Sequence, residues 1–401
     1  MRRGRPARVV NFRDCGPPGV RLHSGSEDAD MRRSHFSLAA WIALIGALAL
    51  GGQPRALAQG QTNPLTGLPV ADAAALERRP MLVKVSNHGA VIRPQSGLSF
   101  ADHVWEHQME GFQVTRYTAV FYSQTPAFVG SVRSTRLIDV EHLVPMYGGL
   151  LVTSGGSTNR QQPATPPRIE ERLRAAEWAR RVVSESWIGD AAYGRPYLDR
   201  LAGVPRPGVP RYHRLFAYPA EIWALMSRKG LNTRPPLTGL VFDANAPAGG
   251  RLTTEAYLDY PGRGPQSLWK YDPATGRWNS WIEDQALRRP ARSANVDYLT
   301  GQPVAFDNVV FLYAPHFVAD FIEDEAAGLP SVGVNLLGEG RAILLRGDQR
   351  YDALWRRYSP DQLMQLYYPD GTPLPFKPGT IWYAVTDTDK YMAGSAFWPT
   401  P

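Results

Sequence analysis

Seven charged side chains lie close together in the sequence and could either perform acid–base chemistry or bind a charged ligand. They are Arg93, Asp102, Glu106, Glu110, Arg116, Arg133 and Arg136. Two carboxylates on one face of a strand can act as acid and base in glycoside or amide hydrolysis, if their environments separate their pKa values. The same carboxylates can instead accept bidentate hydrogen bonds from arginine. The block therefore allows a structural ion-pair network, an anion- or sugar-binding cleft, or a hydrolytic site.

The positions of Arg133 and Arg136 favour binding over catalysis. We predict a helix from Thr135 to about Tyr147, with Ser134 or Thr135 as its N-cap. Guanidinium groups at the start of a helix add to the dipole of its free amide groups and attract a phosphate or carboxylate. We assign no catalytic residue and leave open whether the protein is an enzyme.

One short motif imitates a metal site. Residues 103–107 read His-Val-Trp-Glu-His, the order of the inverted zinc proteases, which places two imidazoles one helical turn apart. The Val-Trp pair and the Glu-Gly turn after it predict a strand instead. In a strand, residues four apart are separated by about 13 Å. We predict no metal site, and no other motif predicts a cofactor.

Two loops supply weaker candidates. Ser154 begins a Ser-Gly-Gly-Ser loop whose backbone can approach a ligand closely, but the Gly-x-Ser-x-Gly elbow of serine hydrolases is absent. His213 lies in the sequence Arg-Tyr-His-Arg and is either a functional imidazole or a hydrogen-bonded loop histidine. Both remain candidate ligand-binding residues.

The apolar pattern predicts the elements that must position these side chains. We expect strands at residues 80–87 and 149–153, and a hairpin of residues 104–109 and 115–122. Residues 129–134 should lead into the helix that begins at Thr135. In that hairpin Glu106, Gln108 and Glu110 share one face by the period of two. Amphipathic helices are predicted at residues 168–187 and 219–229.

The composition changes after residues 235–250, a segment rich in Pro, Gly and Ala that we interpret as a linker. Turn sequences then recur at short intervals, with strands predicted near residues 308–313, 341–346 and 380–386. Residues 268–271 and 277–281 predict an aromatic hairpin. Its rings would form a carbohydrate platform if two or three of Trp269, Tyr271, Trp278 and Trp281 face solvent. We predict an α+β protein, with a mixed α/β domain built on a central sheet at residues 63–245 and a smaller β-rich domain at residues 246–390.

The first sixty residues read as an export signal rather than part of the fold. Residues 31–58 contain a basic head, an apolar run from Phe36 to Gly52, and a small-x-small end at Ala56-Leu57-Ala58. That run falls short of the roughly 20 residues that span a membrane comfortably. We therefore predict export by a cleaved signal peptide, Met31–Ala58. Residues 1–30 are interpreted as a gene-model extension or a disordered segment.

The charge and cysteine content exclude several classes of protein. The formal net charge of the 401 residues is +7, but residues 1–58 hold nine Arg and four acids, so the remainder has 35 basic and 33 acidic residues, or +2. This near-neutral body gives no indication of nucleic-acid binding. The one cysteine, Cys15, excludes a disulfide framework, and after signal cleavage no thiol remains.

Segments spread along the chain resemble the YerB-like lipoproteins, a bacterial envelope family with a domain of unknown function, DUF3048, in N- and C-terminal parts. The matching segments include residues 63–70, 93–98, 130–136, 154–157, 212–216, 269–272, 297–301, 308–310, 338–340 and 378–382, together with Asp102, Glu106, Glu110 and Arg116. The resemblance implies an exported two-domain protein and no established reaction. Two departures stand out: no lipoprotein cysteine follows the signal, and Asn295 replaces an expected histidine before Asp297.

We predict that the protein is secreted or associated with the cell envelope, without a stable transmembrane domain after signal cleavage. Its expected role is that of a binding or accessory protein for a cell-wall, polysaccharide or anionic ligand, or for an envelope protein. The alternatives are a cell-envelope hydrolase that uses Glu106 and Glu110, or Asp102, and an interaction scaffold for wall synthesis that acts through the β-rich domain.

Overall fold

A computed structural model describes residues 61–112, 114–159, 166–201, 205–258, 260, 267–283, 292–388 and 395–398. The predicted extension, the signal peptide and Cys15 lie outside these ranges. Within them, no helix has the length and apolar character needed to cross a membrane.

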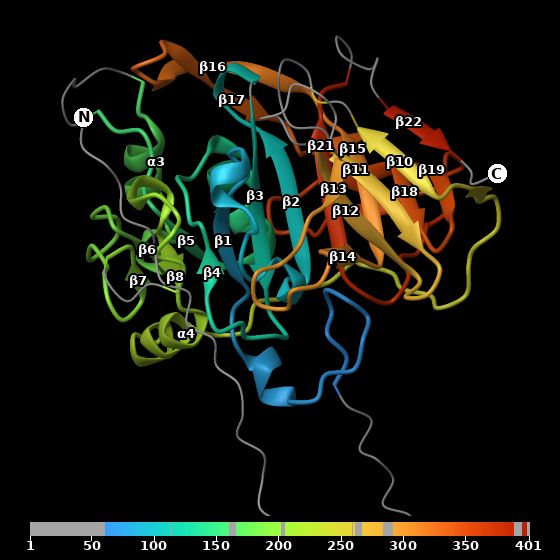
Figure 1. Ribbon diagram of the computed structural model, residues 1–401, viewed down its shortest axis with the longest axis horizontal. Coiled ribbons are helices and arrows are strands. Elements are labelled where there is room, and N and C mark those ends of the chain that lie inside the picture. The colour runs from blue at the N-terminus through green and yellow to red at the C-terminus, as the bar shows by residue number, and fades with distance from the viewer. Residues whose placement is uncertain are drawn as a thin grey trace, which may run out of the picture. The chain divides into compact units, whose positions relative to one another are not determined.

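The described residues form a central mixed sheet of eleven strands. Its order is β20 (Gln365–Tyr367), β19 (Gln349–Arg357), β18 (Gly338–Arg346), β15 (Asn308–Tyr313), β21 (Ile381–Thr386), β2 (His103–Gln108), β3 (Thr115–Phe121), β1 (Met81–Ser86), β5 (Leu150–Thr153) and β6 (Val182–Ser184), with β9 (Arg251–Leu252) beside β19. The sheet joins both halves of the chain, because β2 pairs in parallel with β21 (Figure 1). The predicted hairpin is confirmed as the antiparallel pair β2 and β3.

Both faces of the central strands are covered. Every residue of β1, β2 and β3 is buried. Successive side chains enter opposite core clusters, as the period of two requires: Leu82 and Trp105 lie in one cluster, and Val83 and Val104 lie in the other. The sheet is therefore the middle layer of the fold.

Short helices cover the first face. They include the π-helical turn η5 (Asp139–Leu143), α2 (Val144–Tyr147) and α3 (Ile169–Ala175), whose apolar residues lie in the first cluster. The predicted helix at residues 135–147 thus begins later than expected. Thr135 is not its cap, because the Thr135 hydroxyl donates to Thr153 Oγ1 at 2.8 Å instead. The helix predicted at residues 168–187 ends at Ala175, so the rest of that prediction is wrong. Further along, the β-branched residues Val182 and Val183 of β6 pair with β5 instead.

The second face is covered by α4 (Pro219–Arg228), which confirms the helix predicted there, and by a further sheet. That sheet has six strands: β13 (Arg292–Ala294), β12 (Arg277–Glu283), β11 (Ser267–Asp272), β10 (Glu255–Leu258) and β22 (Ser395–Trp398), with β14 (Ala305–Phe306) on β12. The aromatic hairpin is confirmed as β11 and β12. Trp269 and Trp278 are buried in the core, whereas Tyr271 and Trp281 are half-buried. The hairpin's rings therefore do not provide the solvent-facing platform we considered.

The remaining elements are small. A three-stranded sheet contains β4 (Val129–Gly130), β8 (Phe216–Ala217) and β7 (Leu198–Asp199). β16 (His316–Asp324) and β17 (Leu329–Val334) form a separate hairpin. The 3-10 turns are η1 (Ala73–Glu77), η2 (Ala90–Ile92), η3 (Leu98–Phe100), η4 (Glu110–Phe112), η6 (Ala179–Arg181) and η7 (Arg211–His213).

These elements make an α+β fold, as predicted. Residues 235–250 contain no helix or strand, yet Leu237 is buried and Phe242 forms a bridge with Phe376. The division into domains at residues 63–245 and 246–390 stays a prediction.

Candidate functional site

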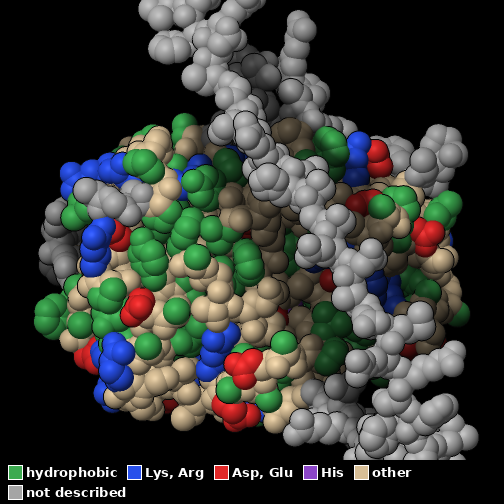
Figure 2. All heavy atoms as spheres, turned by 60° about the horizontal axis from the view of Figure 1, so that its bottom comes forward, with side chains coloured by type: hydrophobic (Ala, Val, Ile, Leu, Met, Phe, Trp, Pro, Cys, Tyr) green, Lys and Arg blue, Asp and Glu red, His purple; other side chains and the backbone are tan. Residues whose placement is uncertain are grey.

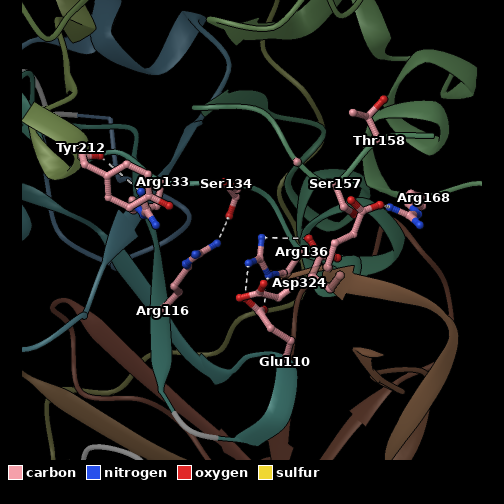
Figure 3. A pocket seen from close by; sticks show the side chains of 13 residues that line it. Glu110, Arg116, Arg133, Ser134, Arg136, Ser157, Thr158, Arg168, Tyr212 and Asp324 are labelled. Carbon is pink, nitrogen blue, oxygen red and sulfur yellow. Dashed lines mark hydrogen bonds and ion pairs between the residues drawn. The ribbon is translucent and has the colours of Figure 1, made fainter. Parts of the chain in front are cut away.

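Most of the predicted arginines border one cavity. It has a volume of about 480 Å³ and lies against the turn after β2, the start of β3 and the segment before η5. The loop after β5 and the turn of the β16–β17 hairpin complete its wall. Glu110, Arg116, Arg133 and Arg136 are the sequence-predicted residues that line it. Figure 3 shows the guanidinium groups of Arg133, Arg116 and Arg136 side by side along one wall.

The end of β2 explains why Glu110 is at the cavity. The strand stops at Gln108, and Gly111 turns the chain in η4 with a φ of 67°. This backbone region is open to glycine at little cost. Glu110 therefore lies beyond the alternation of the strand, and our prediction that it shares a face with Glu106 is wrong.

Glu110 and Arg136 form a buried bidentate ion pair. Arg136 Nε and Nη2 each donate to a Glu110 oxygen at 2.6 Å, and Arg136 Nη1 lies 3.2 Å from Glu323 Oε1. Burial alone would raise the pKa of Glu110, but the charge of Arg136 lowers it to about 2. Burial would likewise lower the pKa of Arg136, and the charges of Glu323 and Glu110 raise it instead. This part of the block is the structural network that we considered.

Arg116 and Arg133 differ from Arg136, because no carboxylate of the described residues forms an ion pair with either. Arg116 is 6% exposed and donates from Nη1 to the Ser134 carbonyl oxygen at 2.8 Å. Burial and the neighbouring positive charge of Arg136 hold the pKa of Arg116 well below its usual value. Arg133 is half-buried, and its guanidinium carbon lies 4.7 Å from the centroid of the Tyr212 ring. The cavity wall thus holds two cations without a charged partner.

The opposite part of the wall comes from the Ser-Gly-Gly-Ser loop already considered as a ligand contact and from two segments that the sequence did not associate with the site. Arg168, which precedes α3, forms an ion pair with Glu325. Glu323 and Asp324 line the cavity from the end of β16. Ser157 lines it from the loop after β5, and its buried hydroxyl has no hydrogen-bond partner among the described residues.

A network of buried polar residues contacts the backbone of Arg136 in the cavity wall. Lys84 is fully buried, and its Nζ lies 2.9 Å from Asp139 Oδ2 and also contacts His107 Nε2. Asp139 accepts the backbone N–H of Arg136 at 2.8 Å. Burial lowers the pKa of Lys84 to about 8, although the charge of Asp139 opposes this. Burial lowers the pKa of His107 to about 3. The network fixes the backbone from which Arg136 projects.

Glu106 and Arg93 lie away from the cavity. Glu106 points to the second core cluster, where it accepts hydrogen bonds from Thr115 Oγ1 at 2.9 Å and Trp382 Nε1 at 3.3 Å. Burial raises its pKa to about 7. Arg93 donates to Asn87 Oδ1 at 2.6 Å, and its charge also acts on Glu106. Because Glu106 and Glu110 occupy different sides of the sheet, they do not form the pair of carboxylates that hydrolysis needs.

The other candidates, Asp102, Ser154 and His213, lie outside the cavity lining. Asp102 is 1% exposed and accepts four hydrogen bonds, from Asn63 Nδ2, the Tyr122 and Ser123 amides, and Ser123 Oγ. Burial nonetheless raises the pKa of Asp102. Ser154 Oγ lies 3.3 Å from the hydroxyl oxygen of Ser134, which lines the cavity, whereas Ser154 is outside the lining. His213 follows the lining residue Tyr212 and stacks on His88, with ring centroids 5.4 Å apart. Burial lowers the pKa of His213.

The histidine motif lies on a strand, as predicted. His103 contacts Tyr147 and the Leu65 carbonyl, and burial lowers the pKa of His103 to about 4. His107 contacts Lys84 and the Gln108 carbonyl. In the described ranges, no group of three or more His, Cys, Asp or Glu is placed to hold a metal ion.

Both halves of the chain match models of one protein family. A family model described as the N-terminal domain of a protein of unknown function, DUF3048, matches residues 65–231. The model of the C-terminal domain of DUF3048 matches residues 256–383. This chain belongs to the DUF3048 family, which confirms the resemblance.

A curated relative is named "Putative lipoprotein YerB", from Bacillus subtilis strain 168. It is 28% identical over 326 residues, which cover 80% of this chain and 84% of the relative. The crystal structure of the YerB protein from Bacillus subtilis matches with a TM-score of 0.62 at 25% identity. That match covers 84% of this chain and 99% of the other.

Proposed function

We propose that this chain is an exported protein of the bacterial cell envelope that binds a small anionic ligand in the arginine-lined cavity. The predicted signal peptide Met31–Ala58 supports export. The name of the relative from Bacillus subtilis, which describes it as a lipoprotein, supports an envelope location.

The observation that carries the proposal is the unpaired state of Arg116 and Arg133 at one cavity. Removing a guanidinium group from water is costly unless an anion compensates its charge. Arg136 has such partners in Glu110 and Glu323, whereas Arg116 and Arg133 face the cavity without one. A carboxylate or phosphate bound there would accept charge-assisted hydrogen bonds from both side chains. The cavity volume is in the range of small-molecule sites.

The carboxylates favour binding over the hydrolase alternative. Glu110 is held by two bonds from Arg136, and Asp102 is occupied by four donors. Glu106 is sealed in the core at 2% exposure. None of these three carboxylates is both open to the cavity and free of a partner, which favours binding of a charged ligand over hydrolysis. The ligand we propose is an acidic component of the cell wall or its polysaccharides.

Calorimetric titration of the purified protein with inorganic phosphate and with glutarate tests this proposal. We expect binding of at least one anion, weaker at high salt because the attraction is electrostatic. Arg133→Gln should weaken it by about tenfold or more, the usual effect of losing a charge-assisted bond. Arg180→Gln is the matched control, because Arg180 is 65% exposed and lies outside the cavity lining. Absence of binding, or equal binding by Arg133→Gln, would overturn the proposal.

A further inference from the structure

The charged side chains that line the cavity balance in number but are not all in ion pairs. Four arginines and four acids line it. Arg136 pairs with Glu110 and Glu323, and Arg168 pairs with Glu325. After these pairs are assigned, the wall retains two cations, Arg116 and Arg133, and one anion, Asp324.

Asp324 has no ion-pair partner in the described part of the chain. Its Oδ1 accepts the Ala327 amide at 3.1 Å within the β16–β17 turn. The side chain is half-buried and lines the cavity. Its charge acts on Tyr212, which stacks with Arg133 at the other end, so the opposite charges face the same space. Asp324 is therefore placed to receive a cationic group from a ligand.

A second acceptor lies beside Asp324. The side chain of Glu323 is 2% exposed, and its Oε1 contacts Arg136. Its Oε2 is buried without a hydrogen-bond partner in the described ranges. A buried acceptor left without a partner costs free energy, and a donor from a ligand removes that cost. An ammonium group carries three donors, so one that binds Asp324 retains donors for a second acceptor.

We propose that the cavity binds a zwitterion, with its anionic group on Arg116 and Arg133 and its ammonium group on Asp324. This inference rests on the proposed function, because it assigns the anion to the same arginines. It adds a selectivity rule: a ligand with negative charge alone meets unfavourable repulsion from Asp324, whereas a zwitterion meets the opposite charge at both ends.

Two sources of this chemistry fit the cavity. One is an amino acid, which carries carboxylate and ammonium groups. The other is a phosphorylated amine, which carries phosphate and ammonium groups. Each has a close analogue that lacks only the ammonium group: glutarate for glutamate, and ethyl phosphate for O-phosphoethanolamine.

Calorimetric titration of the purified protein with these four compounds at neutral pH is the test. We expect at least one zwitterion to bind about tenfold or more tightly than its ammonium-free analogue, which corresponds to one additional charge-assisted contact. The pair that shows this preference identifies the source of the ligand. If both members of each pair bind equally, the zwitterion inference is overturned while the proposed anion site stands. If none of the four binds, both proposals fail.

Two substitutions locate the ammonium subsite. Asp324→Asn should abolish the preference for the zwitterion while binding of the ammonium-free analogue is retained or strengthened. Asp320→Asn is the matched control, since Asp320 is exposed on the same strand and lies outside the lining, and it should leave the preference unchanged. Thermal unfolding of both variants checks that they fold. A preference that persists in folded Asp324→Asn would remove Asp324 from the site and overturn the inference.

Discussion

Arg133 and Arg136 are three residues apart and both line the cavity, but their side chains have different roles. Arg136 is buried between Glu110 and Glu323, whereas Arg133 is half-buried and stacks on Tyr212. Breaking a buried ion pair leaves an uncompensated charge in the interior. Arg136 therefore stabilises the wall, and Arg133 remains available to a ligand.

This difference predicts unequal effects on stability. Arg136→Ala should lower the free energy of unfolding by about 3–5 kcal/mol, because it leaves two buried carboxylates without a compensating positive charge. Arg133→Ala should cost only about 1 kcal/mol or less, the contribution of a partly exposed cation–π contact. Urea denaturation of both variants measures the two values. Equal losses would mean that the Arg136 ion pairs contribute no more than the Arg133 contact.

Glu106 predicts a pH dependence with a definite sign. Burial raises its pKa from 4.5 to about 7. Between these values the native state holds a proton that the unfolded state releases, so this residue's contribution to stability falls as pH rises. We expect the stability of the wild type relative to Glu106→Gln to decrease by about 3 kcal/mol from pH ~4.5 to pH ~7.

Comparing the two proteins at each pH isolates Glu106 from His103 and His107. The pKa of each histidine is lowered by burial, so their contributions to stability change with pH in the opposite direction. Glu77→Gln serves as control, because the Glu77 side chain is 62% exposed. If the difference in free energy of unfolding between the wild type and Glu106→Gln stays constant with pH, Glu106 is not buried in its uncharged form.

At the scale of elements, the turn η4 sets the position of Glu110. Gly111 has a φ of 67°, and a Cβ placed there would lie 2.7 Å from Leu329 Cδ1 on β17. Gly347 has a similar φ of 55°, but a Cβ there would meet nothing within 4 Å. The two glycines therefore share the backbone conformation and differ in their surroundings.

Alanine substitutions separate these two effects. Gly347→Ala should reduce stability by about 1–2 kcal/mol, the cost of a left-handed conformation for a residue with a Cβ. Gly111→Ala should cost about 1–3 kcal/mol more, because the added methyl group must displace Leu329. Thermal or urea unfolding provides both values. The contact between η4 and the β16–β17 hairpin would be unimportant if the two losses were the same.

The elements most accurately predicted from the sequence are those dominated by local pattern. The runs that became β1, β15 and β21 are short and mostly apolar, and α4 has a clear amphipathic period. The segment after Ala175 was predicted as helix because of its alternating charges, yet Val182 and Val183 pair with β5. Such pairing depends on a partner strand about thirty residues earlier, which local propensity does not record.

At the scale of the whole molecule, half of the candidate site could be predicted from the sequence. Four of its arginines and acids come from one block, and the hairpin that carries two of them has its own turn signal. Glu323, Asp324 and Glu325 are consecutive acids in the second half of the chain. Their run was the available signal, but only the docking of β17 against η4 brings them to the arginines. Figure 2 shows basic and acidic side chains interspersed over the face that it displays, in keeping with the nearly neutral composition after residue 58.

The central sheet leads to a prediction about how the chain folds. The two DUF3048 models match residues 65–231 and 256–383, so residues 232–255 separate them. Strands β2 and β21 nevertheless pair with each other across that division, through five residues of each strand. Trp382 of β21 contacts Tyr117 of β3, and both lie in the second core cluster.

A fragment of residues 61–250 would therefore lose its neighbour to β2 and expose an apolar strand edge. We expect neither this fragment nor residues 251–401 to unfold cooperatively in urea, and expect co-expression of the two to restore a folded complex. A full-length protein cut at a protease site inserted after Ala248 is the control, since that residue is exposed and the cut leaves both pieces in place. Cooperative unfolding of either isolated fragment would show instead that one half is an independent domain, as its sequence suggests, and that the shared sheet forms only after that half has folded.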